Sequence, residues 1–159
     1  MNIKVIGLMA ALALLGACSD NTASTGAATG TGAAATTGGA SPGSQEDLVA
    51  NVGDRVFFAF DQSTLSSDAR STLDRQAAWL QRYPQVTIQL AGNCDERGTE
   101  EYNLALGQRR ANAARDYLVA RGISSARITT ISYGKERPVA AGSDEQAYSQ
   151  NRNAITSVR

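Results

Sequence analysis

The feature that most limits the fold of this chain is a strand, an acidic loop and a long helix in direct succession between residues 86 and 121. Residues 86–91 alternate apolar and polar side chains, which is typical of a strand with one buried face. Glycines bound the loop at residues 92–98, and Thr99 is placed to cap a helix that Gly122 ends. The succession predicts a strand–loop–helix unit in an α/β fold.

Three polar side chains of this unit are expected to converge. Asp95 lies in the loop beside the helix N-terminus. Arg110 follows Asn103 by about two turns at 3.6 residues per turn, so the two side chains share a face. A carboxylate, an amide and a guanidinium at one spot suit a ligand that carries an ammonium and a carboxylate, such as an amino-acid end. The alternative is an internal salt bridge between Asp95 and Arg110 that holds the loop on the helix.

The rest of the C-terminal part continues the alternation of strands and helices. Strands are predicted from β-branched and aromatic content at residues 55–60, 128–132 and 154–158. A helix capped by Ser66 or Ser67 is expected to stop before Pro84, and a short helix is expected at residues 143–150. Together these segments predict a single α/β domain at residues 45–159.

The N-terminus has the pattern of a secretory signal. One lysine precedes an apolar run that is shorter than the roughly 20 residues needed to span a bilayer, and small residues follow it. Leu15-Gly16-Ala17-Cys18 resembles the bacterial lipobox. That resemblance implies a signal peptide at residues 1–17 and acyl chains on Cys18, with Ser19 favouring the outer membrane. The alternatives are an ordinary signal with a chance cysteine, or a signal-anchor helix.

Residues 18–44 are expected to form a flexible linker after the anchor. They consist almost entirely of alanine, glycine, threonine and serine. Without large apolar side chains, such a segment cannot bury enough surface to offset the entropy lost on ordering. A coil of this length has a root-mean-square reach of roughly 25–30 Å, which would let an anchored domain contact something away from the membrane.

Composition excludes several classes of function. Fifteen basic and fifteen acidic residues balance, so nothing favours nucleic acid as an electrostatic partner. The absence of histidine excludes a Ser-His-Asp or Cys-His catalytic set and disfavours a zinc site, and no cofactor is expected. Cys94 is expected to be buried and inert. Glu96, Arg97 and Arg109 are interpreted as solvated charges that a protein partner could contact.

Two motifs carry a family resemblance over roughly Asp54 to the C-terminus. From Asp95 the chain reads DERG-x-x-EYN-x-x-LG-x-RRA, and from Ser132 it reads SYGKE-x-P. Both resemble the OmpA-like peptidoglycan-binding domain, and most closely the branch of peptidoglycan-associated lipoproteins (Pal proteins). The resemblance implies an α/β two-layer sandwich, in which a mixed β-sheet carries the main helices on one face.

The resemblance also implies a ligand, meso-diaminopimelate of the peptidoglycan stem peptide. In the family, the acidic residue at the position of Asp95 takes the ammonium of the ligand, and the arginine at the position of Arg110 takes its carboxylate. Asn103 and Leu106 are expected beside them. The remaining expected site residues are Arg152, Phe60, Asp61 and Ser63, although Phe60 alone is more typical of core. Asn93 and Asn153 depart from the histidine and arginine that are frequent in the family.

The function implied is a lipid-anchored tether that binds peptidoglycan and holds the outer membrane to the cell wall. The resemblance adds the Tol system, with TolB and TolA as partners, and a role in envelope constriction at cell division. One alternative is a peptidoglycan-binding lipoprotein outside the Tol system. Another is an enzyme that cuts peptidoglycan with Asp95 and Glu96, but adjacent carboxylates rarely reach the separation that glycosidases need.

Overall fold

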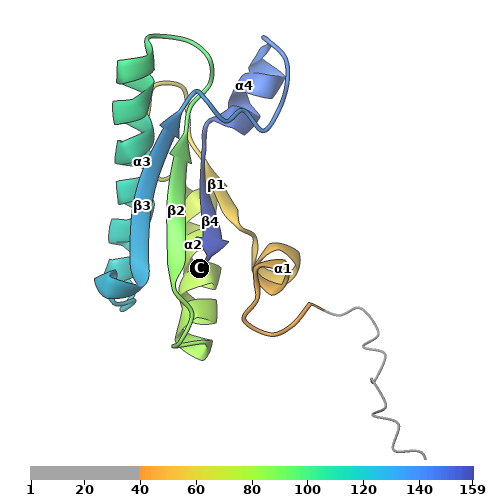
Figure 1. Cartoon of the computed structure of the whole chain (residues 1–159), viewed down its shortest axis with the longest axis vertical. Helices are drawn as coiled ribbons and strands as arrows, with labels where there is room; N and C mark the ends of the chain where they lie inside the picture. The colour runs from red at the N-terminus through yellow and green to blue at the C-terminus, as the bar shows by residue number, and fades with distance from the viewer. Residues whose placement is uncertain (1–39) are drawn as a thin grey trace, which may run out of the picture. The chain divides into compact units, whose positions relative to one another are not determined.

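A computed structural model describes residues 40–159, which form a four-stranded mixed sheet with two long helices on one face (Figure 1). The strands are β1 (Arg55–Phe57), β2 (Ile88–Asn93), β3 (Ile128–Gly134) and β4 (Asn153–Val158). The helices are α1 (Gln45–Asp47), α2 (Ser67–Arg82), α3 (Glu100–Ala120) and α4 (Glu145–Asn151), with a π-helical turn at Leu48–Val52 and a 3-10 turn at Ser125–Arg127.

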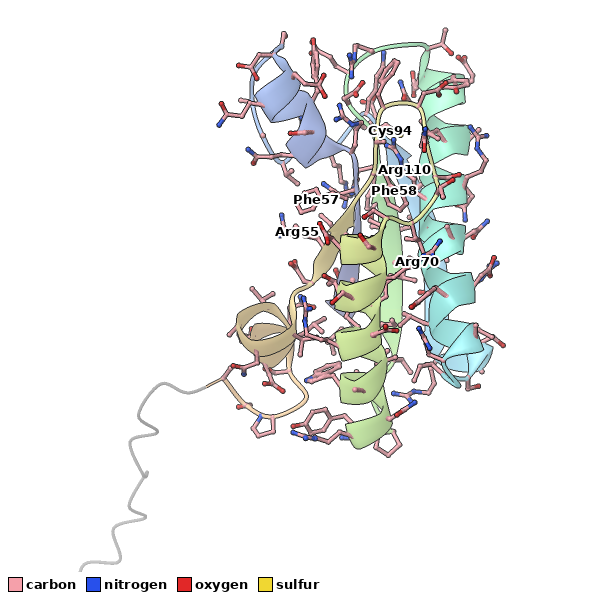
Figure 2. All side chains as sticks on the ribbon, turned by 180° about the vertical axis from the view of Figure 1, so that it is seen from behind. Arg55, Phe57, Phe58, Arg70, Cys94 and Arg110 are labelled. Carbon is pink, nitrogen blue, oxygen red and sulfur yellow. The ribbon has the colours of Figure 1, made fainter. Side chains whose placement is uncertain are left out.

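The sheet has the strand order β1-β4-β2-β3. β2 pairs in parallel with β3, with Leu90 opposite Thr130, and both β1 and β2 pair antiparallel with β4. Figure 2, seen from behind, shows α2 and α3 side by side in front of the sheet. This arrangement confirms the expected two-layer sandwich with a mixed sheet and its main helices on one face.

Helix starts follow the capping residues that the sequence indicates. The side chains of Ser66, Thr99 and Asp144 each accept a hydrogen bond from a backbone N–H three residues further on. These bonds satisfy donors that the first turn of a helix leaves free. The predicted starts of α2, α3 and α4 are therefore confirmed to within two residues.

The first strand is shorter than the predicted 55–60. β1 ends at Phe57, and Asp61 adopts a positive φ of 57° in the turn that follows. The backbone leaves the sheet because the carbonyl groups of Ala59 and Gln62 accept hydrogen bonds from Arg110 on α3. The long-range contact with Arg110 thus outweighs the local preference of residues 58–60 for a strand.

The core lies between the sheet and the two long helices. Its fully buried side chains include Leu73 and Leu80 of α2, Ile88 and Leu90 of β2, and Leu118 of α3. These are the apolar stripes that helical and alternating periodicity predicts. Among residues 40–159, no helix is long and apolar enough to cross a membrane.

The segment that precedes β1 begins with α1, and it attaches at the end of the sheet away from the loop of residues 94–99. The Gln45 side chain bonds to the backbone of Thr156 and Val158 on β4. Val158 lies opposite Ile88, the first residue of β2, whereas the 94–99 loop follows the last residue of β2. Figure 1 shows α1 near the lower end of the sheet and the connection from β2 to α3 at the upper end.

Two glycines let α3 lie close to β2. A Cβ atom on Gly92 would come 1.8 Å from the carbonyl oxygen of Gly107, and a Cβ on Gly107 would come 2.8 Å from the carbonyl oxygen of Gly92. Both distances are shorter than any van der Waals contact, and backbone atoms cannot rotate away as side chains do. The close approach places the N-terminal half of α3 directly against the end of β2.

We expect Gly92→Ala to destabilise the domain by about 3 kcal/mol or more, because the new methyl group overlaps backbone that cannot yield. Urea unfolding of the variant and the wild type measures the difference. Val119→Ala, an exposed change on α3, is the control and should stay within about 0.5 kcal/mol. A Gly92→Ala variant as stable as the control would contradict the close approach.

Candidate functional site

A pocket lies where the loop after β2 meets the start of α3 and the loop after β1. Its cavity volume is about 180 Å³. This is smaller than the roughly 300 Å³ or more of a pocket for a whole drug-sized ligand, so it suits one end of a larger molecule. The lining residues are Phe60, Asp61, Cys94, Asp95, Arg97, Gly98, Tyr102, Asn103, Leu106 and Arg110.

Arg110 forms the floor of the pocket and is 0% exposed. Its guanidinium donates hydrogen bonds to the carbonyl groups of Gln62 at 2.8 Å, Asn93 at 2.8 Å and Ala59 at 3.2 Å. Burial lowers the pKa of Arg110, but an arginine stays protonated in proteins. A guanidinium has five N–H donors, and these bonds use three of them. Figure 2 shows Arg110 close to Phe58 and Cys94 near the upper end of the sheet.

Asp95 is the acidic group of the pocket and is only 4% exposed. Its carboxylate accepts two hydrogen bonds from the Arg97 side chain, at 3.1 and 2.7 Å, and one from Arg152 at 3.3 Å. Burial acts to raise the pKa of Asp95, but the bonds from Arg97 and Arg152 outweigh it, and the pKa is lowered overall. Asp95 is therefore ionised at neutral pH, and its ion pairs are with Arg97 and Arg152.

Arg97 differs from the expected solvated loop charge. Its guanidinium lies 4.2 Å from the centre of the Phe60 ring and 4.3 Å from the centre of the Tyr148 ring. This side chain thus sits between two aromatic rings while it pairs with Asp95. Cation–π contacts of this kind are favourable because the face of an aromatic ring is electron-rich.

Arg152 supports Asp95 from behind the pocket. Its buried side chain donates to the carbonyl group of Phe58 at 3.1 Å and forms ion pairs with Asp95 and, at 2.7 Å, with Glu145. Arg152 is not one of the described residues that line the cavity. A ligand in the cavity would therefore contact Asp95 and not Arg152 itself. We interpret Arg152 as a positioning residue for the carboxylate.

Asn103 holds the loop that carries Asp95. Its side-chain amide donates to the carbonyl groups of Arg97 at 2.8 Å and Thr99 at 3.1 Å. Leu106, one turn further along α3, is buried and contributes an apolar wall. At the opposite rim, the Tyr102 hydroxyl donates to the Asp61 carboxylate. The pocket is therefore lined by two acidic side chains, Asp61 and Asp95, and by two basic ones, Arg97 and Arg110.

Cys94 is buried, its thiol donates to the carbonyl group of Asn103 at 3.3 Å, and burial raises its pKa. A protonated, buried thiol agrees with the expected inert cysteine. Asn93 and Asn153, the two departures from the family pattern, lie in contact: the Asn93 amide donates to Asn153 Oδ1 at 2.8 Å.

The structure brings together six of the eight expected binding residues. Asp95, Arg110, Asn103, Leu106, Phe60 and Asp61 line the cavity. Phe60 is 57% exposed at its rim and is not a core residue. Ser63 and Arg152 lie outside the lining. Sequence reasoning missed Arg97 and Tyr102, for which the only signal was their place inside the DERG-x-x-EYN motif. The expected lipidation site, Cys18, lies outside the described residues.

Comparisons with known proteins agree on one family. The OmpA family matches residues 57–152 of the chain. A peptidoglycan-associated lipoprotein of Mesorhizobium japonicum is 52% identical over 99% of this chain and 92% of its own length. One of Brucella melitensis is 58% identical over 74% of this chain and 70% of its own length.

A solved structure shows the same fold. The crystal structure of the peptidoglycan-associated lipoprotein from Burkholderia pseudomallei is 43% identical in sequence. It superimposes with a TM-score of 0.65 over 67% of this chain and 90% of that chain.

The lowered pKa of Asp95 predicts a pH-dependent contribution to stability. A carboxyl whose folded pKa lies below its unfolded value of about 3.9 stabilises the fold above that pH and loses this effect as the pH falls through the folded pKa. We expect Asp95→Asn to be less stable than the wild type by about 1.5–3 kcal/mol at pH 7, the value of hydrogen bonds to a charged group. Urea titrations at pH 7, 4 and 2.5 should show the difference shrinking below about pH 4. A difference that is independent of pH would contradict the ion pairs.

Proposed function

This chain belongs to the OmpA family, with peptidoglycan-associated lipoproteins as its relatives, and from that premise we propose that its pocket captures diaminopimelate of the peptidoglycan stem peptide. The free end of diaminopimelate carries an ammonium and a carboxylate on one carbon. Binding is non-covalent and, in this proposal, without catalysis. The domain would hold a lipid-anchored protein on the cell wall.

The observation that supports this proposal is the pair of opposite charges at one small cavity. Arg110 and Asp95 both line it, and both are almost completely shielded from water. Charged groups interact more strongly at such a site than in open solvent. The guanidinium of Arg110 suits a carboxylate, which guanidinium can bind through two parallel hydrogen bonds. Asp95 is the complementary acceptor for an ammonium.

The walls of the pocket fit the rest of such a ligand. Leu106 offers apolar surface for the methylene groups that separate the two ends of diaminopimelate. Asp61 and Tyr102 at the rim provide polar groups beside the opening. The small volume accepts one amino-acid end and leaves the remainder of the stem peptide outside the cavity.

The point at which the N-terminal segment enters the domain supports the proposed role as a tether. The chain enters the domain beside the C-terminal end of β4, and the pocket lies at the other end of the sheet. A linker at residues 18–44, anchored to the outer membrane by acyl chains on Cys18, would leave the pocket facing away from the attachment point. We propose this placement, with the domain in the periplasm, as the basis for holding the outer membrane to the wall.

Similarity to peptidoglycan-associated lipoproteins also supports the proposal that this protein acts in the Tol system. In this proposal, TolB and TolA are partners, and the protein contributes to outer-membrane invagination during cell division. The alternative remains a peptidoglycan-binding lipoprotein that acts without the Tol proteins. Binding of purified TolB to the chain, with sacculi as competitor, distinguishes the two.

We expect Asp95→Asn and Arg110→Lys each to weaken binding to purified sacculi by about 10- to 100-fold, because each removes charge-assisted hydrogen bonds worth about 1.5–3 kcal/mol. The chain from Ser19 to Arg159 is incubated with sacculi, and the sedimented fraction is measured with and without free diaminopimelate. The competitor should release the wild type.

Asp116→Asn and Arg115→Lys make the same chemical changes in an exposed ion pair of α3 and serve as matched controls. Circular dichroism melting verifies that each variant is folded, which matters most for the fully buried Arg110. If the folded site variants sediment as well as the controls, Asp95 and Arg110 are structural and the wall-binding surface lies elsewhere.

The proposed anchor gives a separate prediction with an internal control. In a Gram-negative host, Cys18→Ser should move the full-length protein from the membrane pellet to the soluble fraction, because acyl chains can no longer be attached. Cys94→Ser should leave it in the pellet, since Cys94 is buried in the domain. Metabolic labelling with a clickable fatty acid reports the acyl chains directly. Label retained on the Cys18→Ser protein would refute this anchor.

A further inference from the structure

The carboxylate of Asp95 has no free acceptor position in this structure. A carboxylate offers about four lone-pair sites. Oδ1 accepts from the backbone N–H of Arg97 at 3.2 Å and from its Nε at 3.1 Å, and Oδ2 accepts from Arg97 Nη2 at 2.7 Å and Arg152 Nη1 at 3.3 Å. An ammonium that binds Asp95 must therefore replace one of these donors.

Arg97 is the donor that can leave. Its side chain is 36% exposed, whereas the Arg152 side chain is 7% exposed and also bonds to Phe58 and Glu145. Arg97 lines the cavity and Arg152 does not, so a ligand in the cavity meets Arg97 first. Removal of Arg152 would break buried bonds, but displacement of Arg97 moves a side chain that already borders solvent.

We propose that Arg97 is an internal substitute for the ammonium of the ligand, and that diaminopimelate binds by displacing its guanidinium from Asp95. This inference rests on the proposed function of the pocket. Arg97 thereby becomes a specificity-determining residue: a ligand enters only if it brings a cation that restores the charge balance of Asp95.

The structure also provides a second place for the displaced guanidinium. Nη2 of Arg97 lies 3.6 Å from the Glu145 carboxylate, which is largely exposed on α4. The rings of Phe60 and Tyr148 flank the guanidinium and can keep contact with it as it shifts. The exchange therefore replaces the ion pair of Asp95 with Arg97 by an ion pair of Asp95 with the ligand. Arg97 keeps its ion pair with Glu145, so no charge is left unpaired.

Calorimetric titration of the chain from Ser19 to Arg159 tests the displacement. We expect Arg97→Ala to bind free meso-diaminopimelate about 5- to 30-fold more tightly than the wild type, because no internal ion pair has to be broken. Pimelate has the two carboxylates without the ammonium groups, and its affinity should stay equal or fall, because it brings no cation to replace Arg97 beside Asp95. Arg115→Ala removes the same charge from an ion pair on α3 outside the pocket lining and should leave both affinities within about twofold.

A measurement on the wild type covers the case in which Arg97→Ala folds poorly. In the free protein, the Nε–H of Arg97 donates to Asp95 and should give a protected NMR signal. Saturating diaminopimelate should abolish this protection, and pimelate at the same concentration should not. A side chain with a purely structural role would keep its signal in both.

The outcomes separate the two proposals. If wild type binds neither sacculi nor diaminopimelate, the proposed function fails. If wild type binds diaminopimelate, but folded Arg97→Ala binds it equally or more weakly and the Nε–H signal stays protected, then only the displacement is refuted. Arg97 would in that case hold Asp95 in place or contact the ligand itself.

Discussion

The contact on which the rest of this site depends is the buried guanidinium of Arg110 and the three carbonyl groups that surround it. A guanidinium without acceptors would be very costly in the interior. Here the acceptors come from Ala59 and Gln62 in the loop after β1 and from Asn93 at the end of β2. One side chain of α3 therefore fixes two other segments. The same interaction that stabilises these loops also holds the basic floor of the pocket in place before any ligand arrives.

This arrangement requires α3 to lie very close to β2. Gly92 and Gly107 permit the approach, because neither has a Cβ atom between the strand and the helix. Arg110 follows Gly107 by about one helical turn, so the same close approach brings its guanidinium within reach of the Asn93 carbonyl group. Gly92 and Gly107 look like ordinary loop and helix residues in the sequence. They nevertheless determine how close α3, and with it Arg110, lies to β2.

Local sequence signals sufficed for the order and type of the main helices and strands, because caps, strand alternation and the C-terminal glycine act within a few residues. They could not predict the partners of Arg110, because two of its three acceptors lie 48 and 51 positions away in the chain. They misplaced Arg97 for the same reason. Beside Glu96 in an acidic loop it resembles a solvated charge, and only the fold brings the rings of Phe60 and Tyr148 to its two sides. Phe60 was ambiguous because a strand propensity cannot reveal that the chain turns away after Phe57.

A site that must exchange an internal cation for a ligand cation gains only the difference between two similar ion pairs. Under the proposed function, each bond to the wall is therefore modest in strength, and it is selective because an uncharged or anionic group cannot make the exchange. Under the proposed function, many anchored copies face a polymer that repeats the same ligand, so the attachment of the membrane grows with the number of links. Individual links can then open without loss of the whole attachment. A tighter single site, without Arg97 beside Asp95 in the free protein, would instead leave this buried carboxylate with Arg152 as its remaining ion-pair partner and would destabilise the domain.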